Sequence, residues 1–181
     1  MNKAMCFFMG LLFASAAASQ QTFTFSQDGF AEGATVAGSF SGEDLNSDGQ
    51  LASFGGEISD FQMSFSGNSV VPAFSLGFAD LTGLVYDLNG GPLGDGQVLG
   101  IEGIAANDAT FSYEAGPGPV DQCGQGVDCA SVSDGTNTDN SQELIQVGGA
   151  AATPVPSIGL YGLIVMALGL LMLGGRRLPR T

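Results

Sequence analysis

Oxygen-bearing side chains recur at alternate positions in one short segment, Asp44-Leu45-Asn46-Ser47-Asp48-Gly49. The spacing Asp-x-Asn-x-Asp-Gly opens the calcium loop of EF-hand proteins, in which oxygen ligands precede a Gly at the sharp turn. A complete loop has a bidentate Glu at its twelfth position, which here is Gly55, and Glu57 follows two residues later. The segment therefore favours either half of a calcium loop or a hairpin turn that uses Asn, Asp and Gly for their tolerance of left-handed backbone.

In the calcium interpretation, the three alternate side chains bind the metal together with one glutamate. Glu57 is expected to complete the shell, with Glu43 as an alternative. The predicted metal ligands are Asp44, Asn46, Asp48 and Glu57. Calcium is the one cofactor that the sequence suggests.

Catalytic chemistry finds little support in the composition. The chain has no His, and its only Lys is Lys3, so Ser-His-Asp, Cys-His and Ser-Lys nucleophile systems are excluded from the rest of the chain. Paired carboxylates can hydrolyse glycosides, but nothing separates the 18 acidic residues into an acid and a base. No catalytic residue is predicted, and the chain is not expected to be an enzyme. A secreted hydrolase with an acid pair is the weaker alternative.

Charge is divided along the chain. All 18 Asp and Glu lie between residues 19 and 153, whereas all four Lys and Arg lie in the two ends, so the central segment has a formal charge of −18. Binding to a phosphate backbone needs Lys or Arg to displace counterions, which excludes nucleic acid as a partner. Anionic membrane surfaces are excluded for the same reason. Divalent cations and neutral or cationic polymers remain compatible with this charge.

Aromatic and polar residues alternate in several short segments. The clearest are 22–26, 61–65 and 74–78, and weaker ones are 98–102 and 109–113. A period of two is that of a half-buried strand. Clusters of Gly, Asn, Asp and Pro separate these segments, and no amphipathic helix of convincing length is present. The pattern predicts an all-β fold, either an antiparallel sandwich or a jelly-roll-like domain.

Two cysteines enclose a short Gly-rich segment, Cys123 to Cys129. In an oxidising compartment they are expected to form a disulfide, worth about 2 kcal/mol on a chain-entropy estimate. A zinc or redox site is the alternative, but two thiols without His cannot complete a zinc tetrahedron unless carboxylates join them. The following residues, Ser131 to Asn140, are polar and are expected to form a loop, with the last strand at Gln142 to Val147.

The N-terminus has the pattern of a secretory signal peptide. Lys3 supplies the positive region, residues 7–13 supply the apolar core, and small residues fill positions 14–19. The small-x-small rule places cleavage between Ala18 and Ser19, with a mature start at Gln20 as the alternative.

The C-terminus has the pattern of a membrane span. The 18 residues from Ile158 to Gly175 carry no charge and would form about 27 Å of helix at ~1.5 Å per residue. This length is close to the ~30 Å of a bilayer's hydrocarbon core. Arg-rich flanks resist translocation, so Arg176, Arg177 and Arg180 are expected to hold the distal end in the cytoplasm. A buried C-terminal helix of a soluble domain is the alternative.

The residues at the start of this span form a recognisable motif. Val155, Pro156, Ser157 and Ile158 are followed by Tyr161 and Gly162. Motif, span and arginine cluster in this order resemble the exosortase-type protein-sorting tails of Gram-negative bacteria. The most similar variant is IPTL-CTERM, whose motif is Ile-Pro-Thr-Leu-x-x-Trp-Gly. The related PEP-CTERM class remains open, whereas a rhombosortase-type tail would place Gly-Gly closer to the span than Gly148-Gly149.

The resemblance covers about 27 residues and implies how the protein is handled. It implies export through the inner membrane, recognition of the motif by an exosortase-type enzyme, and cleavage near it. It also implies delivery to the cell surface or to an exopolysaccharide matrix. Signal peptidase and the sorting enzyme are the expected partners, and exopolysaccharide is a further one.

The chain is thus expected to have four segments. They are a signal peptide at 1–18, an acidic β-rich extracytoplasmic domain at 19–147, a linker at 148–154 and a sorting signal at 155–181, with its transmembrane helix at 158–175. The expected function is that of a secreted, processed surface or biofilm-matrix protein with a non-catalytic acidic domain. The alternatives are a carbohydrate- or calcium-binding adhesive module and an unprocessed, membrane-anchored ectodomain.

Overall fold

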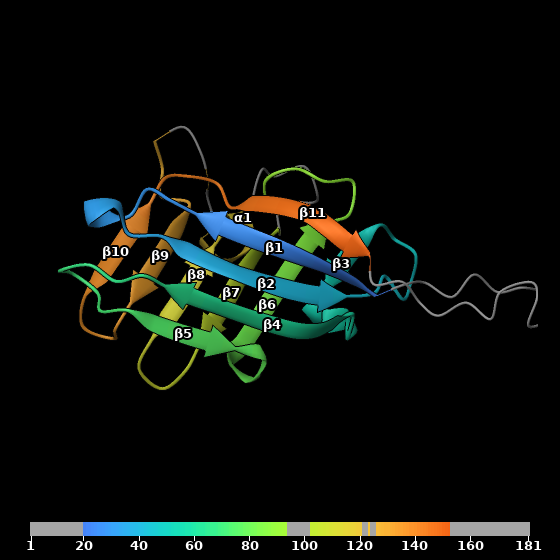
Figure 1. Cartoon of the computed structure of the whole chain (residues 1–181), viewed down its shortest axis with the longest axis horizontal. Helices are drawn as coiled ribbons and strands as arrows, with labels where there is room; N and C mark the ends of the chain where they lie inside the picture. Colours follow the sequence, from blue (N-terminus) through green and yellow to red (C-terminus); the bar gives the residue numbers. More distant parts are fainter. Residues whose placement is uncertain (1–19, 94–101, 121–122, 124–125, 153–181) are drawn as a thin grey trace, which may run out of the picture.

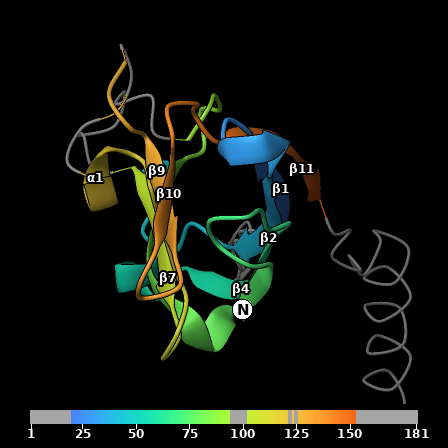
Figure 2. The same cartoon turned by 90° about the vertical axis from the view of Figure 1, so that its left-hand side faces the viewer.

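Two antiparallel β-sheets pack face to face and enclose one hydrophobic core (Figures 1 and 2). The computed structural model describes residues 20–93, 102–120, 123 and 126–152. The predicted all-β antiparallel sandwich is confirmed. The jelly-roll alternative is not what these residues form, because the five consecutive strands β6 to β10 are neighbours within one sheet.

The first sheet, called sheet A here, joins the two ends of the described chain. Its order is β11 (Gln146–Ala152), β1 (Gln21–Gln27), β2 (Val36–Gly42), β4 (Ile58–Phe65) and β5 (Phe74–Gly77). The first and last strands are therefore neighbours, and all pairings are antiparallel.

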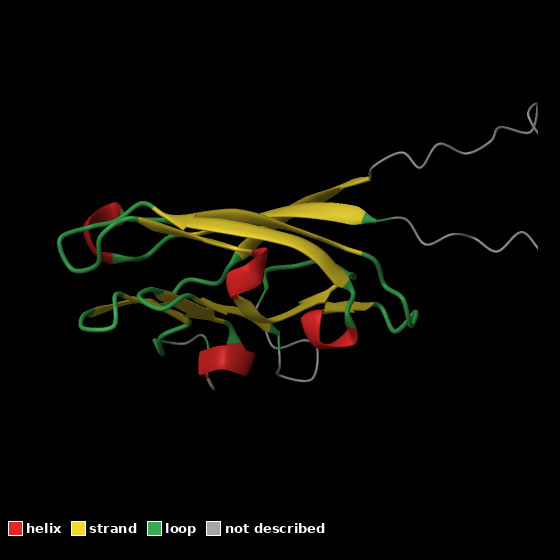
Figure 3. Ribbon diagram, turned by 90° about the horizontal axis from the view of Figure 1, so that it is seen from below, coloured by secondary structure: helices red, strands yellow, loops and turns green. Residues whose placement is uncertain are grey.

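The second sheet, sheet B, is a meander with one added strand. Its order is β10 (Thr138–Ser141), β9 (Ala130–Ser133), β8 (Ser112–Ala115), β7 (Gly103–Asn107), β6 (Leu81–Asp87) and β3 (Gln50–Ala52). Short helical turns connect strands of the two layers (Figure 3). They are η1 (Ala31–Gly33), η2 (Ser53–Gly55), η3 (Phe78–Asp80) and α1 (Pro117–Val120).

Alternation along the strands of sheet A decides which side chains enter the core. In β1, Phe23 and Phe25 are buried, whereas Thr24 and Ser26 are exposed. The register places Phe40 of β2 beside Phe23, so that aromatic side chains of neighbouring strands share the inner face. The outer face of the sheet carries mainly polar residues, such as Thr24, Ser26 and Gln62.

Aromatic contacts across the sandwich hold the two sheets together. Tyr86 of sheet B meets Phe23 and Phe40 of sheet A edge to face, at ring-centroid distances of 5.0 and 5.5 Å. At the other end, Phe111 stacks on Phe74 at 4.7 Å. Each such pair contributes about 0.5–1.5 kcal/mol beyond its burial.

One buried polar network also crosses the core. The Tyr113 hydroxyl donates to Oε1 of Gln27 at 2.7 Å, and Nε2 of Gln27 donates to the Glu143 carbonyl at 2.6 Å. Both side chains are almost fully buried. Because their polar atoms are paired, the network avoids the cost of an unsatisfied buried group.

Some elements differ from the sequence predictions. The segment 131–140, expected as a loop, contributes to the hairpin of β9 and β10, whose strands pair from Ser133–Thr138 to Ala130–Ser141. The last strand begins later than expected and runs to Ala152, so the predicted linker is wrong over 148–152. Its pairing with β1 outweighs the low strand preference of Gly and Ala.

The two ends of the chain lie outside the description. The predicted signal peptide and the predicted span at 158–175 are among residues 1–19 and 153–181, of which the structure describes nothing. Within the described part, no helix has the length and apolar character needed to cross a membrane.

Stability is expected to fall in alkaline solution. Burial raises the pKa of Tyr113 far above its usual value, and burial with the nearby Glu102 and Asp87 carboxylates raises the pKa of Tyr86. A tyrosine whose pKa is higher in the folded than in the unfolded chain contributes to the unfolding free energy. This contribution is present below the pKa of the unfolded chain, about 10, and is lost as the pH rises above that value. Residues 20–152 contain no Lys or unpaired Cys to titrate in the same range.

Chemical denaturation between about pH 8 and about pH 11 measures this effect. The unfolding free energy should fall with pH, and it should fall less steeply in Tyr113→Phe. The slope and not the absolute stability is compared, since the substitution also removes the hydrogen bond to Gln27. If the unfolding free energies of the wild type and Tyr113→Phe change equally with pH, Tyr113 is not the source of the alkaline loss of stability.

Candidate functional site

A single excursion carries the predicted metal ligands. The chain leaves sheet A at the end of β2, joins sheet B through β3, turns through η2 and returns to sheet A at β4. Residues 43–57, called the bridging loop here, make this crossing. Both ends of the loop meet, because the Glu43 amide donates to the Glu57 carbonyl at 2.9 Å.

The first part of the bridging loop is a tight acidic turn. Oδ2 of Asp44 accepts from the Gly49 amide at 3.0 Å, and Oδ1 of Asn46 accepts from the Asp48 amide at 2.9 Å. Asp48 in turn accepts from the Gln50 amide through Oδ1 and from Nδ2 of Asn46 through Oδ2, both at 2.9 Å. Gly49 has φ +84°, a conformation that favours glycine. Three of the four predicted ligands therefore share one turn.

Glu57, the fourth predicted ligand, lies buried beneath this turn. Only 3% of its surface is exposed. Its Oε1 accepts from the Leu45 amide at 3.1 Å, and its Oε2 accepts from the Ala52 amide at 2.9 Å. The carboxylate thus joins the acidic turn to the strand β3. Charge-assisted bonds of this kind are stronger than those between neutral groups and offset part of the cost of burial.

The turn offers oxygen atoms but not a closed metal cage. In the part of the chain that the structure describes, no group of three or more His, Cys, Asp or Glu side chains is placed to hold a metal ion. A calcium ion here would need Asn46, backbone carbonyls or water in addition to the carboxylates, ligands that calcium accepts readily. Each carboxylate oxygen keeps a second lone pair beside its bond to an amide.

Other acidic residues have a structural role that the sequence did not reveal. Asp108 accepts from the Thr110 and Phe111 amides, and Asp134 accepts from the Thr136 and Asn137 amides, at 2.6–2.9 Å. These bonds lower the pKa of both carboxyl groups. Each is an Asx-type turn, which acidic residues form without any cation. Asp139 instead accepts from the Ala31 amide at 3.0 Å and links β10 to η1, the turn between β1 and β2 of sheet A.

The two predicted disulfide cysteines are bonded to each other. Their Cα atoms are 4.4 Å apart, and Cys129 is buried. The Cys129 amide donates to the Ser141 carbonyl at 2.6 Å, and its carbonyl accepts from the Gly116 amide at 2.9 Å. The bond therefore links Cys123 to the end of sheet B where β8, β9 and β10 meet.

The remaining predicted sites fall outside the described residues. They are the cleavage site at Ala18 and Ser19, the sorting motif at Val155, Pro156, Ser157, Ile158, Tyr161 and Gly162, and the arginines Arg176, Arg177 and Arg180. They stay predictions from the sequence.

Comparison of the chain with protein-family models, with curated proteins and with solved structures found no match.

Loss of the Glu57 charge should loosen the bridging loop. In Glu57→Gln one acceptor oxygen is replaced by an NH₂ group that faces a backbone amide, which should cost about 1–3 kcal/mol of unfolding free energy. Glu43→Gln is the matched control, because it removes the same charge from the same loop at a partly exposed side chain. Denaturant titration of both variants measures the difference, and equal stabilities would show that the Glu57 bonds contribute nothing.

Proposed function

We propose that this chain is an exported, non-catalytic surface or matrix protein, in which an acidic β-sandwich is released from a membrane-anchoring sorting tail. The observation that carries the proposal is the division of charge. All 18 acidic residues lie between the predicted signal peptide and the predicted tail, and all four basic residues lie in those two ends. Basic ends flanking apolar segments are what orient a chain during membrane transfer.

The body of the chain fits this role. In the described part of the chain, residues between Phe23 and Val147 form one hydrophobic core between the two sheets. A formal charge of −18 with no cation keeps copies apart and soluble outside the cell. The disulfide agrees with an oxidising compartment.

Calcium binding by the acidic turn is a second candidate function. The specific observation is that Asp44 and Asp48 lie in one turn above the buried Glu57, with no cation in the described residues to offset them. Carboxylates held this close repel one another, and a divalent cation would relieve that repulsion. In a matrix, bound calcium would also screen repulsion between neighbouring acidic domains.

The sorting motif should control the fate of the tail. Pro156→Ala combined with Tyr161→Ala should leave the chain unprocessed in the inner membrane, whereas Thr153→Ala, just before the motif, should be processed like the wild type. Immunoblots of membrane, surface and medium fractions, with antibodies against the body, measure the size and location of both variants. Equal distribution of the motif variant and the wild type would contradict recognition at this motif.

Calcium chloride should raise the thermal midpoint of the exported chain. Magnesium chloride at the same concentration is the comparison, because general screening acts through either divalent cation. Asp44→Asn and Asp48→Asn should remove the excess shift caused by calcium, since a ligand that binds only the native state stabilises it. Equal shifts with the two salts would show that the turn is a structural hairpin without a calcium site.

A further inference from the structure

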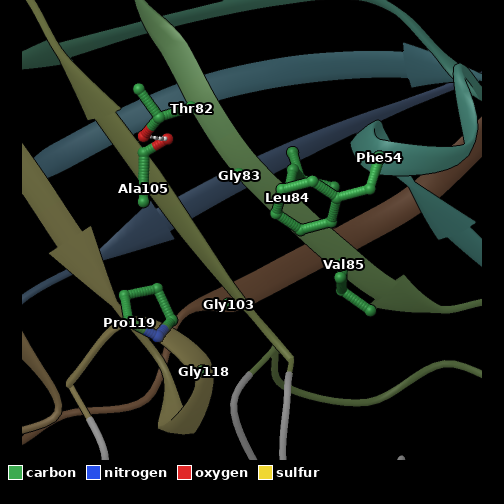
Figure 4. Close-up of a pocket in the computed structure, with 9 residues that line it drawn as sticks. All are labelled: Phe54, Thr82, Gly83, Leu84, Val85, Gly103, Ala105, Gly118 and Pro119. Atoms are coloured by element: carbon green, nitrogen blue, oxygen red, sulfur yellow. Dashed lines mark hydrogen bonds between the residues drawn. The ribbon is translucent and has the colours of Figure 1, made fainter.

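An apolar cleft of about 360 Å³ lies on the outer face of sheet B (Figure 4). Its floor is formed by β6 and β7, where Gly83 lies opposite Ala105 and Val85 lies opposite Gly103. Phe54 from η2 and Pro119 from α1 stand on either side. Because the two glycines have no side chain, the Phe54 ring lies over Gly83 and the Pro119 ring lies close to Gly103, and the apolar space lies between these two walls.

The aromatic wall is held in place although it is exposed. Phe54 is 79% exposed, the largest exposure among the exposed large hydrophobic side chains of the described residues. The neighbouring Ser53 accepts from the Leu84 amide through its Oγ at 2.9 Å, which fixes η2 against β6. A Cβ atom at Gly83 would lie 3.2 Å from Cζ of Phe54, so the ring extends over this glycine. Aromatic side chains, Phe among them, are enriched at binding interfaces.

The polar groups around the cleft are hydrogen-bond acceptors. The Thr82 hydroxyl donates to the Ala105 carbonyl at 3.0 Å, which leaves its oxygen lone pairs for an incoming donor. Glu114 is exposed on β8 directly opposite Ala105, beside the floor. No Lys, Arg or His occurs in residues 20–152. The surroundings therefore favour a ligand that presents hydroxyl donors and carries no negative charge.

These features exclude several occupants. A peptide strand would need free backbone groups, but β6 and β7 each have a neighbouring strand on both sides. The acidic body of a second copy, residues 19–153, would bring another formal charge of −18. Anionic polymers are repelled for the same reason. A neutral sugar ring has an apolar C–H face that can stack on Phe54 and hydroxyls that can donate to Thr82 and Glu114.

We infer that this cleft is a subsite for one ring of a neutral polysaccharide, stacked on Phe54. The inference rests on the proposed location outside the cell, where such polymers occur, and gives the acidic domain a specific ligand class. Sequence reasoning did not single out Phe54, because Gly83, Ala105 and Pro119 come from distant parts of the chain and only the fold brings them together.

Affinity electrophoresis of the exported chain, purified in detergent, tests the inference. The gels contain laminarin, dextran or a galactomannan as neutral probes, and alginate as the anionic comparison. At least one neutral polymer should retard the chain in a saturable manner, and alginate should not. Phe54→Ala should weaken the interaction about fivefold or more, as the loss of one stacking contact predicts. Gly83→Val, which fills the space beneath the ring, should act in the same direction.

Phe78→Ala is the matched control, since Phe78 is an exposed Phe of another helical turn, η3, and does not line the cleft. It should bind like the wild type, and the thermal midpoint of Phe54→Ala should be unchanged. If Gly83→Val fails to fold, the result with Phe54→Ala alone decides the test.

The inference is overturned if none of the three neutral polymers binds, or if Phe54→Ala binds them as well as the wild type does. Retention on octyl-agarose that Phe54→Ala weakens and Phe78→Ala does not, without binding to any neutral polymer, would assign the cleft to an apolar partner instead. None of these results depends on removal of the tail, so they are separable from the test of processing.

Discussion

The absence of any cation from the body of the chain constrains the rest of the structure. Residues 20–152 contain no Lys, Arg or His, so no carboxylate there can be neutralised by a side chain of the same segment. The acidic groups are stabilised by backbone amides instead, at the turns of Asp48, Asp108 and Asp134 and at the buried Glu57. Self-repulsion of these charges opposes folding. Burial of the aromatic core and its contacts across the sandwich must offset it, which explains why so many Phe side chains occupy inward positions.

The fold could be predicted only where a strand shows its own pattern. Alternating Phe residues indicated the strands that became β1, β4 and β5, because these strands bury one face and expose the other. The strand β2 shows no such signal, since Gly38 occupies an inward position to leave room for the ring of Phe25. The strands β9 and β10 have the composition of a loop, and their pairing comes from the closed meander of sheet B. Such tertiary pairing is not visible in a local pattern.

The same distinction applies to the sites. The acidic turn was predictable because Asp44, Asn46 and Asp48 bond within six residues, where spacing alone decides geometry. The position of Glu57 beneath the turn follows from the return of the chain to sheet A, and the cleft at Phe54 needs three separate segments. The bridging loop therefore contains a turn that depends on local sequence, the acidic turn, and a residue of the cleft, Phe54, whose neighbours come together only in the folded sandwich. The acidic turn and Phe54 lie on opposite sides of β3 in sequence.

The central claim is that the acidic sandwich is exported and then separated from its tail. Intact mass spectrometry of the protein recovered from its native host, with cell surface and medium analysed separately, tests this most directly. The account predicts a species that begins near Ser19 and ends near Val155-Pro156, and extra mass at the new end would identify a carrier. A species that retains Arg176 to Thr181 and occurs only in the inner membrane would contradict the account, and would leave an acidic ectodomain on a permanent anchor.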